Sequence, residues 1–274
     1  MKRLLGNVVK YTSLLLGAVV AIIPILAIFL ASFKTGTEYP TSGALELPNS
    51  WGYFENYKRA FTEGNMLVGF KNTIIILVIS VIGTTLIGSM VAFVLDRFNF
   101  KGSKVILGAF LLATLIPGVT TQVATLQIVH GLGLFNTIWA AVILYLGTDI
   151  IAIYIFLQFM QSISVSLDES AMLDGASYFT IYKKIVLPLL KPAIVTVFII
   201  KGVNVYNDFY TPYLYMPKSE LHVISISLFK FQGPFGAEWQ VIAAGVMIAI
   251  IPTLIAFIFL QKYIYNGLTN GSVK

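Results

Sequence analysis

Long apolar runs, separated by short polar segments, are the feature that most restricts what this chain can fold into. Several runs approach the roughly 20 residues that a helix needs to cross a lipid bilayer. Only 11% of the 274 residues are charged, whereas soluble domains carry about 25%. A large soluble protein with a buried helical core is therefore a poor alternative, and the sequence predicts an all-α membrane protein.

The apolar runs divide the chain into six predicted transmembrane helices within a single polytopic domain, residues 1–274. The first run is too long for the apolar core of a signal peptide, about 7–15 residues, so it is interpreted as a retained helix. Pro117-Gly118 interrupts the third run. The predicted spans are 12–33, 70–95, 105–128, 138–160, 192–214 and 241–263, with an external loop at 34–67, a cytoplasmic loop at 164–190 and a tail at 264–274.

The distribution of basic residues predicts which side of the membrane each loop occupies. Lys and Arg favour the cytoplasmic side, most strongly in short loops. With the N-terminus inside, eleven of the eighteen Lys and Arg residues are cytoplasmic and six are external, where Lys71 and Lys262, at the ends of their spans, are counted with the adjacent side. The remaining one, Lys201, lies deeper within a span. Six spans then place both termini and the 164–190 loop in the cytoplasm.

Aromatic residues in the 34–67 loop recur at helical spacing. Asn49 and Ser50 precede them as candidate caps. The spacing predicts a short amphipathic helix on the outer surface, with these aromatic residues on one side: Trp51, Phe54, Tyr57 and Phe61.

Several classes of chemistry lack the residues they need. The chain has no cysteine, which excludes disulfides and thiolate sites, and its two histidines are isolated in sequence. No phosphate-binding G-x-x-x-x-G-K-[ST] motif occurs, so ATP cannot be hydrolysed here by a P-loop. The net charge of +6 is scattered beside apolar runs and does not indicate nucleic-acid binding. A membrane enzyme would also need a catalytic cluster that the spans do not offer.

The polar segment 169–188 lies between two apolar runs and has its own helix signals. Ser166 and Glu169 have the spacing of a capping box, and Asp168 and Glu169 would face the positive end of that helix. Gly175 is a natural stop, after which a second helix should begin near 176–177 and end or turn at Pro188. Its predicted apolar face is formed by Phe179, Tyr182, Ile185 and Val186. Many such loops only join two spans, and helix signals alone do not distinguish a connector from a docking element.

This segment resembles the EAA loop of ABC importer permeases. The signature is Glu-Ala-Ala, three residues, Gly, nine residues, then Ile-x-Leu-Pro. Here it reads Glu169-Ser170-Ala171, Gly175 and Ile185-Val186-Leu187-Pro188, with both gaps intact. Ser170 replaces the usual first alanine and is small enough to fit. The resemblance implies an EAA-type coupling loop, with ATPase-coupling residues at Glu169, Ser170, Ala171, Asp174, Gly175, Leu187 and Pro188.

Other stretches resemble the carbohydrate branch of these permeases, and in particular the smaller permease subunit of maltose-type importers. They include Asn72-Thr73, Gly133-Leu134 with Asn136-Thr137, and the C-terminal 267–274. The resemblance implies a second homologous permease subunit, two cytoplasmic ATPase subunits that bind ATP and Mg, and an external or periplasmic sugar-binding protein. It also implies that the tail contacts the ATPases through Gly271, Ser272, Val273 and Lys274.

Polar residues within the predicted spans are costly in lipid and usually face a cavity or a partner. Asp149 in the fourth span and Lys201 in the fifth lie about equally far from the cytoplasmic ends of their spans, which predicts a buried ion pair. Lys201, Asn204 and Asp208 share a helical face. Candidates to bind sugar hydroxyls or stack on sugar rings are Asn204, Tyr206, Asn207, Asp208, Tyr210 and Gln122. The alternative is that these groups bond neighbouring helices.

Together these features predict a non-enzymatic permease subunit of an ATP-driven importer of a sugar, expected to be an oligosaccharide, in the cell membrane. The chain itself is expected to hold no cofactor or metal. Two alternatives remain open. The same machine could carry a polyol, glycerol phosphate or a peptide, or the chain could be a secondary transporter that works without ATPases, against which the 169–188 segment argues.

Overall fold

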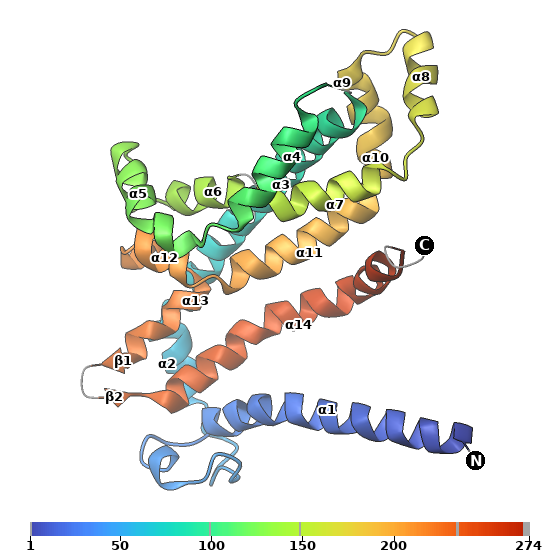
Figure 1. The fold of residues 1–274 in the computed structure, drawn as a ribbon. Coiled ribbons are helices and arrows are strands. Elements are labelled where there is room, and N and C mark those ends of the chain that lie inside the picture. Colours follow the sequence, from blue (N-terminus) through green and yellow to red (C-terminus); the bar gives the residue numbers. More distant parts are fainter. Residues whose placement is uncertain (1, 99, 148, 234–235, 271–274) are drawn as a thin grey trace. The chain divides into compact units, whose positions relative to one another are not determined.

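The computed structural model describes residues 2–98, 100–147, 149–233 and 236–270. These residues are almost entirely helical, apart from one short antiparallel hairpin in which Gln232 pairs with Ala237 (Figure 1). The elements in chain order are α1 Lys2–Ser32, η1 Tyr39–Thr41, α2 Glu55–Glu63, α3 Met66–Arg97, α4 Ser103–Thr114, α5 Gly118–Gly131, α6 Ile138–Leu146, α7 Ile150–Met160, α8 Val165–Leu173, α9 Tyr178–Ile181, η2 Tyr182–Val186, α10 Leu187–Leu189, α11 Lys191–Asn207, α12 Tyr210–Tyr215, η3 Ser219–Leu221, α13 Ile224–Ser227, η4 Leu228–Phe231, β1 Gln232–Gly233, β2 Gly236–Ala237 and α14 Trp239–Asn270.

Three helices are long and apolar enough to cross a membrane, and they lie in α1, α3 and α14. Three further pairs of helices meet the same criteria when each bent pair is taken together, which gives three to six candidate spans. The chain is therefore a nearly all-α, multi-pass membrane protein.

The third and fourth predicted spans are each divided into two helices. α4 and α5 are bent by 100°, with Pro117 in an extended conformation (ψ 131°) just before α5. A proline disfavours helix in the residue before it and cannot donate its own backbone hydrogen bond, so the interruption seen in the sequence becomes a sharp corner. α6 and α7 are bent by 41°, with Asp149 extended (ψ 92°) before α7.

The fifth predicted span also differs from a single helix over 192–214. α11 ends at Asn207, Asp208 is extended (ψ 116°), and the short helix α12 follows. The sixth predicted span lies within α14, which continues to Asn270 and so includes the first residues of the predicted tail.

The chain forms two compact units, and the first comprises Met1–Leu67 and Ile226–Ile255. Within it, the predicted amphipathic helix of the 34–67 loop is α2. Buried Asn56 attaches it to the end of α1 by donating to the backbone oxygens of Ser32 and Lys34. The predicted caps are wrong, because α2 starts after Phe54, which makes no capping bond. The aromatic residues cover the end of α1 instead, where the ring of Phe33 contacts those of Trp51, Phe54 and Tyr57.

The second unit comprises Val68–Ser225 and Ala256–Lys274. Its apolar core joins α3, α7, the 178–190 segment and the start of α11. Phe156 and Met160 of α7 are fully buried there, together with Ile181 and Val186. This core supports the base of the 164–190 loop, so the loop projects from a packed region.

Candidate functional site

The 164–190 loop begins with α8, whose N-terminus is capped by Ser164. Ser164 Oγ accepts from the backbone N–H of Ser166 (3.3 Å) and lies 2.7 Å from Ser166 Oγ. The predicted capping box from Ser166 to Glu169 is therefore wrong. Ser166 lies inside the helix, so it cannot supply the non-helical backbone that a cap requires.

As predicted, Gly175 ends the first helix of the loop. Its φ of +82° lies in the left-handed region that favours glycine. The backbone N–H of Gly175 bonds the oxygen of Met172 (3.0 Å), and that of Ala176 bonds the oxygen of Ala171 (2.9 Å). This pair of bonds is a Schellman motif, which satisfies the last carbonyls of α8 and sets the angle at which the chain leaves it.

The second arm of the loop begins at α9, capped by Ser177 Oγ, which accepts from the N–H of Thr180. The arm then passes through one π-helical turn, η2, which shifts the helical periodicity. In α9, before this turn, Ile181 is buried, whereas Phe179, predicted on the apolar face of the arm, is 64% exposed. Pro188 neither ends nor turns the arm. It lies inside α10, and the bend of 72° follows at Leu190.

Most of the predicted coupling residues lie on the outside of this two-arm loop. Glu169, Ser170, Asp174, Gly175 and Pro188 are exposed, while Ala171 and Leu187 are partly buried. Leu173, at the end of α8 beside the glycine bend, is 90% exposed. The loop thus presents two carboxylates and a bare apolar side chain, a combination suited to a cleft with basic and apolar groups. The predicted tail contacts, Gly271, Ser272, Val273 and Lys274, lie outside the described residues.

Within the second unit, the structure brings Asp149 and Lys201 together. Lys201 Nζ donates to Asp149 Oδ2 at 2.8 Å, and neither side chain is more than 20% exposed. Asp149 is not in the middle of a helix, as predicted, but caps the N-terminus of α7, where Oδ1 accepts from the N–H of Ala152. One carboxylate therefore serves both the ion pair and the helix break.

Asp208 is held by a second set of bonds at the other end of α11. Its Oδ2 accepts from the hydroxyl of Tyr145 (2.8 Å), and its Oδ1 accepts from the backbone N–H groups of Tyr210 and Thr211. Lys201 Nζ lies 5.8 Å from the centre of the Tyr145 ring. The two carboxylates thus connect α6, α7 and α11 at their breaks, which favours a structural role for Asp208.

The other sequence candidates for substrate contact are only partly brought together. Asn204 joins Asp149 and Lys201 in lining a cavity of about 40 Å³, which is far below the roughly 300–1,000 Å³ of small-molecule sites. Asn207 and Tyr210 are exposed, Tyr206 and Gln122 are partly buried, and Asn207 Nδ2 donates to the backbone oxygen of Val203. The cavity that Asn204 lines is therefore too small to hold a sugar.

A model of the inner membrane component of binding-protein-dependent transport systems matches residues 84–270. The chain belongs to this family. The permease is also 32% identical to the arabinooligosaccharides transport system permease protein AraQ of Halalkalibacterium halodurans, over 94% of this chain and 92% of AraQ.

Two further relatives agree with this assignment, and one solved structure shares the fold. The permease is 32% identical to the probable starch degradation products transport system permease protein AmyC of Thermoanaerobacterium thermosulfurigenes, over 98% of each chain. It is 31% identical to the galactooligosaccharides transport system permease protein GanQ of Bacillus subtilis, over 100% of this chain and 97% of GanQ. A bacterial ABC transporter involved in alginate import shares the fold with a TM-score of 0.82, at 21% identity, over 94% of this chain and 96% of that one.

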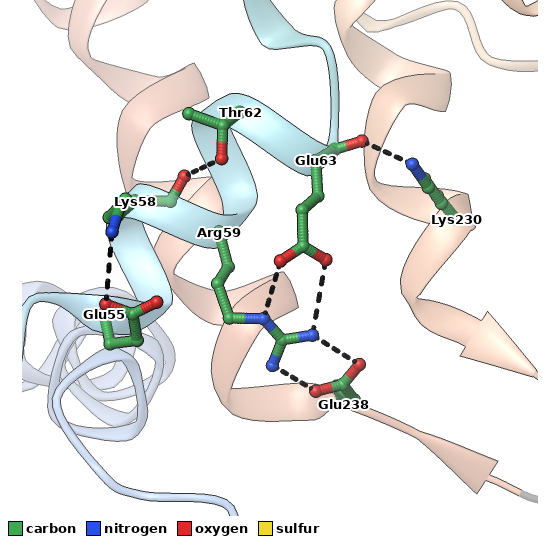
Figure 2. A network of polar contacts seen from close by, with 7 residues as sticks. All are labelled: Glu55, Lys58, Arg59, Thr62, Glu63, Lys230 and Glu238. Carbon is green, nitrogen blue, oxygen red and sulfur yellow. Dashed lines mark hydrogen bonds and ion pairs between the residues drawn. The ribbon is translucent and has the colours of Figure 1, made fainter.

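The permease also has a charged network in its first unit that sequence reasoning missed (Figure 2). Arg59 of α2 bonds both oxygens of Glu238 (2.6 and 3.0 Å) and also contacts Glu63, while Lys230 Nζ donates to the backbone oxygen of Glu63. The hydrogen bond from Arg59 lowers the pKa of the Glu238 carboxyl. The hydrogen bonds that Arg59 donates to Glu238 and Glu63 raise the pKa of its guanidinium. The network joins α2 to the residue before α14. Its members are far apart in sequence, so no local pattern could have identified them.

Proposed function

We propose that this permease is the transmembrane subunit of an ATP-driven importer that moves an oligosaccharide into the cell. It works with a second homologous permease, two cytoplasmic ATPases that hold ATP and Mg, and an external sugar-binding protein. In this arrangement the chain crosses the cell membrane six times, with each bent pair as one span and both termini in the cytoplasm.

The observation that carries the proposal is the exposed two-arm loop around Gly175. Glu169 and Asp174 supply negative charge, and Leu173 supplies an apolar side chain that no described residue of the chain covers. An ATPase cleft with a basic rim and an apolar floor would bind this surface and could displace it when the two ATPases close. ATP hydrolysis would then belong to the partner chains, and this subunit would convert their motion into a change of access across the membrane.

The proposal of a sugar cargo rests on the relatives. Three of them are named as permeases for arabinooligosaccharides, starch degradation products and galactooligosaccharides. Exposed Asn207 and Tyr210 and the partly buried Gln122 are candidates to contact a sugar in the assembled pathway. The same architecture with a polyol, glycerol phosphate or a peptide as cargo is the alternative.

Co-purification tests the docking part of the proposal. The permease is expressed with its ATPase, and the amount of ATPase retained on the tagged permease is measured together with stimulation of ATP hydrolysis by sugars. Glu169→Lys should abolish retention, because it places a positive charge against the basic rim of the cleft. Glu46→Lys, the same charge change in the 34–67 loop, should not. If Glu169→Lys leaves both ATPase retention and uptake intact, the loop is not the docking element.

The same complex tests the cargo. Arabino-, malto- and galactooligosaccharides are compared with glycerol, glycerol phosphate and a short peptide as stimulants of ATP hydrolysis in the presence of the binding protein. Stimulation by an oligosaccharide supports the proposal, and stimulation by a non-sugar alone supports the alternative. Uptake that continues without any ATPase would support a secondary transporter.

Orientation can be measured directly because the chain has no cysteine. Single cysteines at Leu173 and at Leu47, both exposed, are treated with a membrane-impermeant maleimide in intact cells. Labelling at 47 but not at 173 supports a cytoplasmic 164–190 loop, and the reverse pattern contradicts it.

A further inference from the structure

The first arm of the 164–190 loop is attached to α3 by a buried arginine. Arg97, the last residue of α3, donates from Nε to Asp168 Oδ2 (2.6 Å) and from Nη2 to the backbone oxygen of Ile163 (2.9 Å). Its remaining nitrogen Nη1 contacts Asp96 Oδ2 (2.5 Å). The side chains of Arg97 and Asp168 are each only 5% exposed. Charge-assisted bonds of this kind are the strong ones, and here they are shielded from water.

Little else positions α8. All of its residues are described, and Asp168 is the only buried one. Its larger apolar side chains are exposed, at Val165, Leu167, Met172 and Leu173. Partly buried Ala171 reaches the edge of the apolar core. The direction of α8 therefore depends on the bond between Asp168 and Arg97 more than on hydrophobic packing.

The second arm is attached to the same stretch of α3. The hydroxyls of Tyr182 and Ser89 lie 2.8 Å apart in the buried interior, and the ring of Tyr182 packs against Phe93. Ser89 precedes Arg97 by eight residues, which is about 12 Å along a helix. Both arms of the loop are thus fastened to one short length of α3.

We propose that Arg97 and Asp168 are positioning residues that make α8 and α3 move as one body, so that α3 receives the displacement of the loop. This inference rests on the proposed function and adds the element that receives the motion. Neither residue would touch the ATPase or the cargo, because both side chains are buried within the permease.

The choice of variant separates a positioning role of Arg97 and Asp168 from a purely structural one. Removing one charge leaves the other buried without its partner, whereas replacing both with apolar residues of similar size usually restores stability. The informative variant is therefore Arg97→Met with Asp168→Leu. It can keep the fold but lacks the directional bond. Lys101→Met, which removes an exposed positive charge near the same end of α3, is the matched control.

The motion can be followed with two spin labels in the cysteine-free chain. Leu167→Cys labels α8 and Ile82→Cys labels α3, both at exposed positions. Ile82 and Arg97 are 15 residues apart, or about 22 Å along the helix, which suits double electron–electron resonance. The distance distribution is recorded in nanodiscs for the permease alone and for the complex with and without a non-hydrolysable ATP analogue.

The unmodified chain and Lys101→Met should give a narrow distribution that nucleotide does not shift. The double variant should give a broader distribution in the isolated permease and a shift with nucleotide in the complex. Its uptake per ATP hydrolysed should fall roughly fivefold or more, as expected for loss of a typical coupling energy.

Unaltered narrow distances in the double variant overturn the positioning role. If the unmodified permease retains no ATPase, the proposed function fails. The comparison of the isolated chains then still decides whether Arg97 and Asp168 hold α8 to α3.

Discussion

Lys201 Nζ and Asp149 Oδ2 lie 2.8 Å apart and connect α11 to the first turn of α7 within the second unit. The same carboxylate caps α7 through the N–H of Ala152. A charge in this setting has little access to water, so each partner is stable only in the presence of the other. The helix break before α7 is therefore held by a pair of residues from two different helices.

The single variant Lys201→Met should lower the free energy of unfolding by about 3–5 kcal/mol, because it leaves the Asp149 carboxylate buried and unpaired. Asp149→Asn should also destabilise the protein, although asparagine keeps the capping acceptor. The double variant should be milder than the sum of the singles. Thermal unfolding of all four proteins in nanodiscs measures this, and strictly additive losses would rule out the pairing.

Asp208→Ala should destabilise the permease, because it removes the acceptor of the Tyr145 hydroxyl and of two backbone N–H groups. Hydrogen bonds to a charged group contribute about 1.5–3 kcal/mol. Asn207→Ala, on an exposed residue, should change the unfolding temperature little and reduce sugar uptake. Equal unfolding temperatures for Asp208→Ala and the unmodified protein would contradict the structural role of Asp208.

Leu173→Ser should weaken ATPase binding without affecting the fold, because Leu173 is 90% exposed in the isolated permease. Burying a leucine side chain in a partner contributes about 1.5–3 kcal/mol, so affinity should fall at least about tenfold. Binding of the purified ATPase to permease nanodiscs gives the affinity. Leu47→Ser, at an exposed leucine of the 34–67 loop, is the control and should bind normally.

Gly175→Ala should cost about 1 kcal/mol of stability or more, because the φ of +82° is unfavourable for a residue with a β-carbon. Gly175→Asn should cost less, since asparagine adopts this conformation more readily. The measurement is hydrogen exchange of the amides of α8. Gly108→Ala, in α4 where nothing lies within 4 Å of an added β-carbon, is the control and should leave those amides unchanged.

The contact between Arg59 and Glu238 predicts a pH dependence. The pKa of Glu238 is lowered by its hydrogen bond from Arg59, so the stability it contributes is fully present above the ordinary carboxyl pKa of 4.5. That contribution is lost as pH falls through the lowered pKa of the folded protein, when Glu238 gains a proton and Arg59 stays charged. It should be small, about 0–1 kcal/mol, because both side chains are partly exposed.

Unfolding temperatures of the unmodified protein and Glu238→Gln should differ at pH 7 and converge toward pH 3. High salt should reduce the difference at pH 7. Glu55→Gln, which affects only the looser contact with Lys58 (4.0 Å), should show a smaller difference throughout. A difference that grows on acidification would mean that Glu238 acts through something other than its charge.

Short-range sequence patterns predicted helices and helix ends where the interactions that determine them are also short-range. The apolar runs predicted the helices α1, α3 and α14, because each is long enough to specify a helix in lipid by itself. The bounds were less accurate: α1 begins ten residues before the predicted span, and α14 ends seven residues after it. Gly175 predicted the end of α8, because only a residue without a side chain adopts that backbone angle freely. The cap was misplaced by two residues, since Ser164 and Ser166 are chemically equivalent candidates.

Breaks inside the spans depended on contacts between helices. The sequence indicated Pro117 as an interruption but not a bend of 100°, and it placed Asp149 in the middle of a helix instead of at a cap. Polar residues at a break are satisfied by whichever neighbour lies opposite, and helical periodicity contains no information about that neighbour.

By itself, the sequence determined the membrane character of this protein, its all-helical class, the two-arm loop around Gly175 and the pairing of Asp149 with Lys201 as a hypothesis. Composition and short-range spacing are enough for these, because lipid forces the backbone to satisfy its hydrogen bonds within each helix. Only the tertiary structure decided that Arg97 holds α8 through Asp168, that Tyr145 binds Asp208, and that Phe179 is exposed while Ile181 is buried. These outcomes depend on contacts between residues distant in sequence, which form only when the helices pack.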